Sequence, residues 1–548
     1  MQIIIPMSGI GKRFQDAGYK IPKPLIEINQ KPIIAHILDM FPGETNFKFI
    51  CNSEHLEKTN MKKILGKYCP NGEVISIEPH KLGPVYAVSK IFDSIDSKLP
   101  TIINYCDFCC YWNYEYFKKW INICKPDGCI PAYKGFHPHS LRGNNYAFMR
   151  VKDGWMEQIK EKEPFTKDKI NEFTSSGTYY FANGKLVKKF FSELISKNIS
   201  INNEFYCSMV YNLMIEKNLK IAVYELQHFM QWGTPEDFSE YLKWSNIFED
   251  LISRKHLYHK EFEGTTLIPL AGKGNRFKKE NYNLPKPMIK VSGKPMVIQA
   301  IRSLPKTEKN HFIALQNLIK TVNIEKVLRR EYPKCKLTIL KEEKSGQAMT
   351  CLSATTNIQK NSKLTISACD HGVIYDENKF TSLLNNDNID IIIWVTKGHA
   401  SAINNPEMYG WVKEVEGKVK KISVKKPLND PSSDPIVIGT FTFKNESFFN
   451  KSAQNLIKRN EKINGEFYVD SCINDAISLG YKCHVFYVNH YLCWGTPNDL
   501  KTFEYWQSCF HKYHNHPYAY ELDIFKLNSQ NNSYPEHIKE INPAFLNI

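Results

Sequence analysis

Short, uninterrupted apolar runs alternate along the chain with stretches in which apolar residues recur at helical spacing. Clear runs cover residues 3–5, 47–50, 100–104 and 389–394. Continuous apolar, often β-branched runs of this length are typical of buried strands. Strands that alternate with helices predict an α/β fold with a mixed, mostly parallel sheet flanked by helices.

The first apolar run leads directly into a glycine turn. Gly9 and Gly11 follow it, with Arg13 just beyond and Lys23 ten residues later. A strand that ends in such a turn presents successive backbone N–H groups that can cradle phosphate, and the two cations add positive charge. The spacing is not that of a Walker P-loop, and no third glycine completes a dinucleotide-binding fingerprint. Taken alone, the turn is also compatible with a plain link between strand and helix.

The same arrangement occurs a second time, which argues against a chance match. An apolar run at 266–270 leads into Gly272 and Gly274, with Arg276 and Lys286 following. Separations of 263 positions (272 − 9 for the glycines) relate Gly9 to Gly272, Lys23 to Lys286, Asp107 to Asp370 and Pro164 to Pro427. Separations of 262 positions (439 − 177) relate Gly177 to Gly439 and Trp232 to Trp494. A nearly constant offset predicts a tandem repeat of two homologous domains.

The repeat sets the expected domain boundaries. We expect a first domain over 1–247, a connector over 248–264 with a charged, helical pattern, and a second domain over 265–505. Residues 506–548 are rich in Asn, His, Tyr and Pro and are expected to form a C-terminal extension.

One aspartate follows an apolar run at the same place in each copy. Asp107 comes after the run at 101–103, and Asp370 after the run at 364–369. Ligands of open α/β sheets lie at the carboxyl ends of strands, and a carboxylate there, opposite a phosphate loop, is a natural Mg²⁺ ligand. An aspartate that caps the next helix is the simpler alternative, but it is weakened by the recurrence.

Composition and charge narrow the class of protein. The chain has 548 residues, 42% of them hydrophobic and 24% charged, which is ordinary for globular domains. No stretch has the roughly 20 apolar residues that a membrane span needs, and the first run is too short for a secretion signal. The formal net charge of +15 is spread along the chain, so we expect neither a nucleic-acid nor a membrane partner. The 15 cysteines form no zinc or disulfide framework, and we expect a cytoplasmic protein.

With these motifs, the chain resembles the sugar-phosphate nucleotidyltransferases, also called nucleotide-sugar pyrophosphorylases, in two tandem copies. The family opens with G-x-G-[ST]-R, followed by P-K-P and a later K-P. The first copy has these as residues 9–13, 22–24 and 31–32, and the second as 272–276, 285–287 and 294–295. The resemblance covers nearly all of both copies and implies two tandem Rossmann-like (GT-A-like) domains.

The resemblance also implies roles for individual residues. It assigns catalytic contacts with the triphosphate to Arg13, Lys23, Arg276 and Lys286, and Mg²⁺ binding to Asp107 and Asp370. Implied nucleotide-binding residues are Met7, Ser8, Gly9, Gly11, Lys12, Glu78, Gly83, Leu270, Ala271, Gly272, Gly274, Asn275, Glu343 and Gly346. Implied acceptor-binding residues are Lys162, Gly177, Glu204, Lys425, Lys426, Gly439 and Glu466.

Three positions depart from the family pattern. The [ST] before Arg is Lys12 in one copy and Asn275 in the other. The Lys before Pro is Lys426 in the second copy but Glu163 in the first, beside Lys162. A second aspartate, which many members use as a metal ligand, is replaced by Gln231 and Cys493.

The implied reaction transfers NMP from an NTP to a sugar phosphate or a related phospho-compound and releases pyrophosphate, in the supply of capsule or other surface polysaccharide precursors. A GT-A-type glycosyltransferase is the first alternative, although no Asp-x-Asp follows the strand in either copy. A second alternative pairs one catalytic copy with a non-catalytic nucleotide-binding copy. The base, the acceptor and the oligomeric state stay open, and an oligomer is possible.

Overall fold

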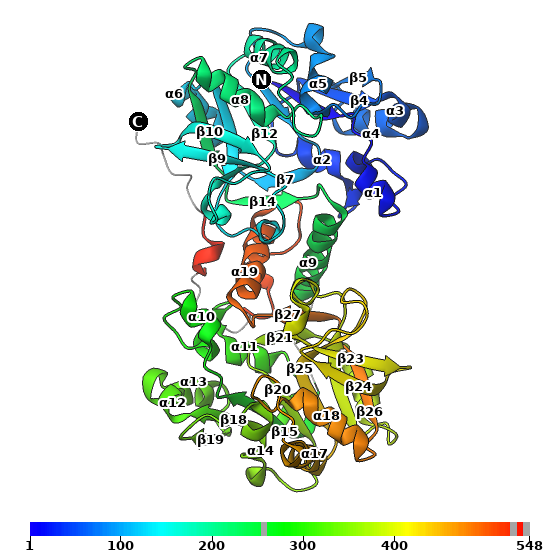
Figure 1. Cartoon of the computed structure of the whole chain (residues 1–548), viewed down its shortest axis with the longest axis vertical. Helices are drawn as coiled ribbons and strands as arrows, with labels where there is room; N and C mark the ends of the chain where they lie inside the picture. Colours follow the sequence, from blue (N-terminus) through cyan, green and yellow to red (C-terminus); the bar gives the residue numbers. More distant parts are fainter. Residues whose placement is uncertain (254–259, 527–533, 541–548) are drawn as a thin grey trace. The chain divides into compact units, whose positions relative to one another are not determined.

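The computed structural model describes residues 1–253, 260–526 and 534–540, and it divides into two compact units (Figure 1). Unit 1 comprises Met1–Phe248, Tyr505–Tyr518 and the described part of Glu536–Ile548. Unit 2 comprises the described parts of Glu249–Glu504 and Ala519–Pro535.

Unit 1 is built on a ten-stranded sheet that mixes parallel and antiparallel neighbours. In spatial order its strands are β11 (Phe173–Ser175), β9 (Ala147–Lys152), β10 (Trp155–Glu161), β13 (Ile221–Glu225), β8 (Gly128–Tyr133), β12 (Thr178–Phe181), β6 (Thr101–Asn104), β1 (Gln2–Met7), β4 (Phe47–Asn52) and β5 (Glu73–Ile77). Separate two-stranded pairs are β2 (Glu27–Ile28) with β3 (Lys31–Pro32), and β7 (Phe108–Tyr111) with β14 (His228–Gln231).

Unit 2 repeats this strand order in a nine-stranded sheet. In spatial order its strands are β19 (Lys336–Leu340), β18 (Lys306–Leu315), β15 (Glu261–Leu270), β20 (Leu364–Ser367), β25 (Ile436–Phe443), β22 (Ile391–Thr396), β26 (Cys483–Tyr487), β24 (Lys418–Val424) and β23 (Gly410–Val415). The smaller pairs are β16 (Lys290–Val291) with β17 (Lys294–Pro295), and β21 (His371–Ile374) with β27 (His490–Cys493). The apolar runs predicted as strands therefore lie in β1, β4, β6 and β22.

The mixed α/β architecture is confirmed, but a mostly parallel sheet was too broad a prediction. In unit 1 only β5, β4, β1 and β6, together with β8 and β13, run parallel to a neighbour. The other half is antiparallel, because β9 and β10 form a hairpin and β12 lies antiparallel between β6 and β8. A hairpin needs only a tight turn, whereas parallel neighbours need a long crossover.

Helices cover the sheets at matched places in the two units. In Figure 1, α5 (Gly83–Ser89), α7 (Gly184–Ser196) and α8 (Cys207–Glu216) lie together on unit 1. Their counterparts in unit 2 are α14 (Gln347–Leu352), α17 (Glu446–Arg459) and α18 (Val469–Ser478). The side chains of Asn183 and Asn445 cap the starts of α7 and α17 by accepting backbone N–H bonds. Apolar residues of strand and helix join in each core, for example Ile4 with Phe190 and Leu267 with Phe449.

The remaining helices line the other parts of each unit. In unit 1 these are α1 (Lys12–Asp16), α2 (Ile33–Leu38), α3 (Ser53–Lys58), α4 (Met61–Tyr68), α6 (Tyr114–Cys124) and the first part of α9 (Pro235–Ser253). In unit 2 these are α10 (Asn275–Lys279), α11 (Met296–Arg302), α12 (Gln316–Val322), α13 (Ile324–Glu331), α15 (Glu377–Leu384), α16 (Ala400–Asn404) and the first part of α19 (Pro497–Lys512). Within the described ranges, each helix is too short or too polar to cross a bilayer.

Two segments differ from the expected boundaries. Of the connector expected over 248–264, residues 249–253 continue α9 and residues 261–264 belong to β15, while 254–259 lie outside the described residues. The extension expected over 506–548 begins inside α19, and Tyr505–Tyr518 packs in unit 1. Tyr505 donates its hydroxyl to the Phe229 carbonyl at 2.7 Å, a buried aromatic contact that ties the end of α19 to unit 1.

Candidate functional site

The glycine turn lies at the carboxyl end of the first strand of each unit. In unit 1 it links β1 to α1, and in unit 2 it links β15 to α10. Gly11 and Gly274 have φ values of +71° and +61°, a left-handed conformation that favours glycine. A Cβ built on Gly9 or Gly272 would meet no atom within 4 Å. The turn backbone therefore borders open space in both units.

A lysine and the strand-end aspartate meet beside each turn. Lys23 and Lys286 open the short 3₁₀ segments Lys23–Leu25 and Lys286–Met288. The Lys23 Nζ lies 3.0 Å from the Asp107 carboxylate, and the Lys286 Nζ lies 2.5 Å from the Asp370 carboxylate. The sequence separates each pair by more than eighty residues, and the fold brings both pairs to the same edge of the sheet.

These contacts shift the pKa values of Lys23, Lys286 and Asp370. Burial works against the Lys23 ammonium, but Asp107 outweighs it, so the pKa of Lys23 is raised; Asp370 raises the pKa of Lys286 in the same way. Burial alone would raise the pKa of Asp370, but the Lys286 charge and a hydrogen bond from His371 hold that pKa well below its usual range. Each pair therefore places a partly buried ammonium against a carboxylate, and the depressed pKa of Asp370 keeps that carboxylate ionised at neutral pH.

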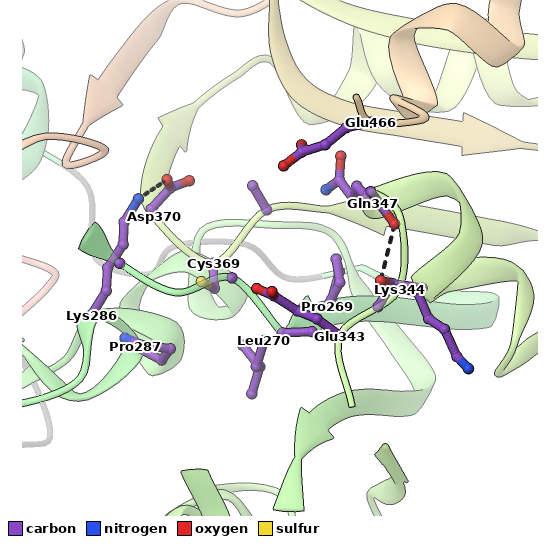
Figure 2. Close-up of a pocket in the computed structure, with 16 residues that line it drawn as sticks. Pro269, Leu270, Lys286, Pro287, Glu343, Lys344, Gln347, Cys369, Asp370 and Glu466 are labelled. Carbon is purple, nitrogen blue, oxygen red and sulfur yellow. Dashed lines mark hydrogen bonds and ion pairs between the residues drawn. The ribbon is translucent and has the colours of Figure 1, made fainter. Parts of the chain in front are cut away.

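Each turn and its Lys–Asp pair line one cavity. The cavity of unit 1 has a volume of about 810 Å³, and its lining includes the predicted residues Met7, Ser8, Gly9, Gly11, Lys12, Arg13, Lys23, Gly83, Asp107 and Glu204. The cavity of unit 2 is smaller, about 300 Å³, and its lining includes Leu270, Ala271, Gly272, Gly274, Lys286, Glu343, Gly346, Asp370 and Glu466. Figure 2 shows Lys286 and Asp370 on one side of this cavity, and Gln347 and Glu466 on the other.

Several other predicted residues lie outside the cavity linings. These are Glu78, Lys162 and Gly177 in unit 1, and Asn275, Arg276, Lys425, Lys426 and Gly439 in unit 2. Lys162 is connected to the cavity lining through Tyr206. It donates to the Tyr206 hydroxyl at 2.6 Å, and this hydroxyl donates to the lining residue Glu204. Gly177 supports the wall, since a Cβ there would lie 3.2 Å from the ring of Tyr105, which lines the cavity.

The matched backbone also identifies the counterpart of Lys162. Lys162 and Lys425 share the left-handed conformation, with φ values of 61° and 58°. Their backbone amides donate to the carbonyls of Tyr146 and Tyr409. Lys426 is exposed on the next position. Left-handed non-glycine residues are uncommon, so this agreement makes Lys425, rather than Lys426, the counterpart of Lys162.

The sequence reasoning missed several residues that line the cavities. His80 lines the cavity of unit 1, and its Nε2 lies 3.2 Å from the Ser8 hydroxyl. The offset of 263 positions pairs His80, rather than Glu78, with Glu343. The same offset pairs Pro84 with Gln347 and Tyr105 with Ala368, and all four line a cavity. The constant offset relates these lining residues between the two copies, although their residue types differ.

The turn itself differs between the units. Ile10 occupies the middle position in unit 1 and lines the cavity. Lys273 occupies it in unit 2 and forms a 2.9 Å ion pair with Glu343. This pair joins the glycine turn to the segment before α14, where unit 1 has the uncharged side chain of Ile10 opposite His80. The two cavities therefore share the glycines of the turn and the Lys–Asp pair but differ in charge where the turn faces the segment before α5 or α14.

A close approach of backbone joins the two ends of each cavity. Gly83 has φ +83°, and a Cβ there would lie 2.7 Å from the Phe205 amide nitrogen. Gly346 has φ +102°, and a Cβ there would lie 2.5 Å from the Phe467 amide nitrogen. Phe205 and Phe467 directly follow the lining residues Glu204 and Glu466. The glycines therefore hold the segments that carry these glutamates.

The oxygen donors fit a site for Mg²⁺ that substrate phosphates would complete. No cluster of three or more His, Cys, Asp or Glu able to hold a metal occurs within the described ranges. Asp107 lies close to the Gln231 amide across Gly233, whereas Asp370 lies close to the Cys493 thiol across Gly495. Mg²⁺ is commonly bound through one or two carboxylates plus phosphates and has little affinity for thiols. In unit 2, Cys493 is therefore unsuited to serve as a second protein ligand of Mg²⁺.

A comparison with known protein families supports the predicted nucleotidyltransferase resemblance for unit 2. Residues 266–476 match the model of the nucleotidyl transferase family. No curated protein sequence matches the chain. The match supports the predicted resemblance over the residues it covers, which lie within unit 2 and make up less than half of the chain.

Solved structures that are similar to this chain include three nucleotide-handling enzymes. A nucleoside-diphosphate-sugar pyrophosphorylase from Vibrio cholerae RC9 is 18% identical over 43% of this chain and 98% of its own, with a TM-score of 0.36. An inositol-1-phosphate CTP transferase from T. maritima is 18% identical over 44% and 95%, with a TM-score of 0.37. A UDP-glucose pyrophosphorylase solved with UDP-glucose is 18% identical over 44% and 97%, with a TM-score of 0.34. At these TM-scores the likenesses carry no functional argument.

Proposed function

We propose that each unit transfers a nucleotidyl group from a nucleoside triphosphate to the phosphate of a small acceptor, with a sugar phosphate as the leading candidate. The observation that carries this proposal is the recurrence, in two cavities, of a glycine turn beside a partly buried Lys–Asp pair. The family match over 266–476 supports it for unit 2. The product would be an activated precursor of the kind used to build surface polysaccharide.

The reaction needs charge stabilisation more than proton transfer. An oxygen of the acceptor phosphate bonds to the α-phosphorus, the bond from that phosphorus to the bridging oxygen breaks, and pyrophosphate leaves with the electron pair. The acceptor phosphate is already ionised at neutral pH, so no general base is required. The chain's contribution is to align the two phosphates and to stabilise the added negative charge.

The residues of each cavity divide this work. Backbone amides of the glycine turn would hold the triphosphate, and Lys23 or Lys286 would face its charged oxygens. Arg13 and Arg276 are exposed on the first helices and would reach the same phosphates. Mg²⁺, held by Asp107 or Asp370 together with phosphate oxygens, would offset phosphate charge. Lys162 and Lys425, with Glu204 and Glu466, would form the acceptor end.

A coupled screen tests the proposal. The full chain is incubated with each of the four NTPs and a panel of phosphorylated acceptors, and pyrophosphate release is measured. We expect Lys23→Ala and Lys286→Ala each to lower the turnover of its own unit about 100-fold, because each removes a fixed cation from the phosphates. Lys20→Ala and Lys279→Ala, at exposed positions on the same segments, are matched controls. Full activity of the double Lys23→Ala/Lys286→Ala variant would refute the proposal.

Gln347 provides a test of how unit 2 recognises the base. Its amide lines the cavity near Glu466, whereas Pro84 stands at the matched position in unit 1 (Figure 2). In a Lys23→Ala background, Gln347→Ala should lower kcat/KM for the preferred NTP about 10-fold, the effect of losing one or two hydrogen bonds. The kcat/KM values for the other three NTPs should fall less, so the difference in kcat/KM between the preferred NTP and the others should become smaller. An unchanged preference would exclude Gln347 from base recognition.

A further inference from the structure

A carboxylate near the acceptor end is supplied by different elements in the two units. In unit 1, Glu161 at the end of β10 is paired across the hairpin with Ala147. The matched pair in unit 2 is Val424 on β24 with Gly410 on β23. Strand β24 therefore lacks the carboxylate that β10 carries beside Lys162.

The helix packed on this hairpin carries a carboxylate in unit 2 but not in unit 1. Ser208 on α8 donates its hydroxyl to Glu161 at 2.6 Å. The matched position on α18, at the 262-residue offset, is Asp470, whose Oδ2 would lie 2.5 Å from a Cβ built on Gly410. Unit 1 can have alanine opposite the small Ser208, whereas unit 2 has glycine opposite the larger Asp470.

Helices α8 and α18 pack on their hairpins in the same register, as the hydrogen bonds of one asparagine in each helix show. One turn after Ser208, Asn212 exchanges two hydrogen bonds with the backbone of Ile159, at 3.0 and 2.8 Å. One turn after Asp470, Asn474 makes the same two bonds with Ile422, at 2.8 and 2.9 Å. Ser208 and Asp470 therefore occupy equivalent places above their hairpins.

Burial and a neighbouring lysine act on both carboxylates. Burial raises the pKa of Glu161, against the charge of Lys162, and the nearby Glu204 raises it further. Burial raises the pKa of Asp470 to about 6, against the charge of Lys425. Lys425 in turn lies within the influence of Arg276 and Glu466. Within the described ranges, no side chain donates a hydrogen bond to Asp470. The half-buried carboxylate of Asp470 therefore has its own backbone amide as a donor and keeps capacity for further hydrogen bonds.

We propose that Asp470 is an acceptor-binding residue of unit 2, which accepts hydrogen bonds from hydroxyl groups next to the acceptor's phosphate. This inference rests on the proposed function and assigns hydroxylated phosphates, such as sugar or polyol phosphates, to unit 2. Lys425 takes the anionic end, and Asp470 takes the hydroxyl groups. A half-buried carboxylate that packs beside Lys425 and receives no side-chain hydrogen bond within the described ranges can accept from such hydroxyl groups, and hydrogen bonds to charged groups in a protein are strong.

The test uses a Lys23→Ala background, so that turnover reports unit 2. KM values are measured for the NTP, for glucose 1-phosphate and glycerol 3-phosphate, and for ethyl phosphate, which has no hydroxyl group. Asp470→Ser should raise the KM of the hydroxylated acceptors about 30-fold and leave those of ethyl phosphate and the NTP within about twofold. The double change Asp470→Ser/Val424→Glu copies unit 1 and should restore most of the loss.

A second variant guards against misfolding. Gly410→Ala leaves Asp470 in the chain but displaces its carboxylate, so it should raise the same KM values. Ala147→Gly is the matched control in unit 1 and should leave the KM values of both units unchanged. Unaltered acceptor KM values in Asp470→Ser, or equal increases for ethyl phosphate and glucose 1-phosphate, would overturn the inference.

The outcome also separates this inference from the proposed function. If no NTP and acceptor pair releases pyrophosphate, binding of glucose 1-phosphate to the full chain is measured by saturation-transfer NMR. Binding that Asp470→Ser weakens would support the role of Asp470 while the nucleotidyl transfer fails. Binding that the variant leaves unchanged, or no binding to the parent protein, would overturn the inference.

Discussion

Alanine at Asp370 will abolish pyrophosphate release by unit 2 and spare unit 1, and alanine at Asp107 will do the opposite. Each aspartate is the carboxylate that borders its cavity at the strand end and pairs with a buried lysine. Its loss removes the proposed Mg²⁺ ligand and leaves a partly buried ammonium without its carboxylate partner. We expect a decrease in kcat of at least about 1,000-fold, because metal and cation positioning fail together. The measurement is the rate of pyrophosphate release with the best NTP and acceptor pair for each unit.

Two controls separate a loss of chemistry from a loss of fold. Asp93→Ala in unit 1 and Asp387→Ala in unit 2 remove exposed carboxylates away from the cavities and should keep full activity. Titration with Mg²⁺ provides a second readout, since Asp370→Asn should raise the Mg²⁺ concentration needed for half-maximal rate. If Asp107→Ala and Asp370→Ala both retain their activity, neither aspartate holds a metal, and the enzymatic proposal loses its main chemical support.

The sequence was sufficient to bring together the glycine turn, the lysine and the aspartate that line one side of each cavity. The glycine turn, the following lysine and the strand-end aspartate are short local signals, and their recurrence at one offset identified Lys23 and Asp107 with Lys286 and Asp370. Such signals survive because the carboxyl ends of adjacent parallel strands meet at one edge of a sheet. The direct Lys–Asp contact was not predicted, since it depends on how the 3₁₀ segment folds back.

The acceptor end could not be predicted in the same way. Glu161 and Asp470 lie at different positions in the repeat, one on a strand and one on a helix, and only the docking of helix on hairpin relates them. His371 was also missed as a neighbour of Asp370, because Phe108 holds the matched position in unit 1. When a carboxylate moves from a strand in one unit to a helix in the other, the two positions are not related by the constant offset of the repeat, and a sequence comparison does not pair them.

Alanine at Gly83 or Gly346 should disable one whole unit, although neither glycine carries a functional group. Both residues have positive φ, and a Cβ would come within 2.7 or 2.5 Å of the backbone of Phe205 or Phe467. Backbone bonds make this contact rigid, since Phe467 donates to Ser345 and accepts from Ala348, at 2.9 Å each. The strain and the overlap together should lower the free energy of unfolding of that unit by about 3 kcal/mol.

The functional consequence of these alanines should reach both substrates. Because the displaced segment carries Glu204 or Glu466, while the glycine itself lines the part of the cavity proposed to hold the nucleotide, KM should rise for the NTP and for the acceptor together. Gly66→Ala is a matched control, since Gly66 lies on the exposed face of α4 with open space around it. Alanine there should leave activity unchanged and stabilise the helix by up to about 1 kcal/mol. Thermal unfolding and steady-state kinetics of the three variants measure both effects, and a fully active Gly346→Ala would show that the two ends of the cavity are not coupled through this contact.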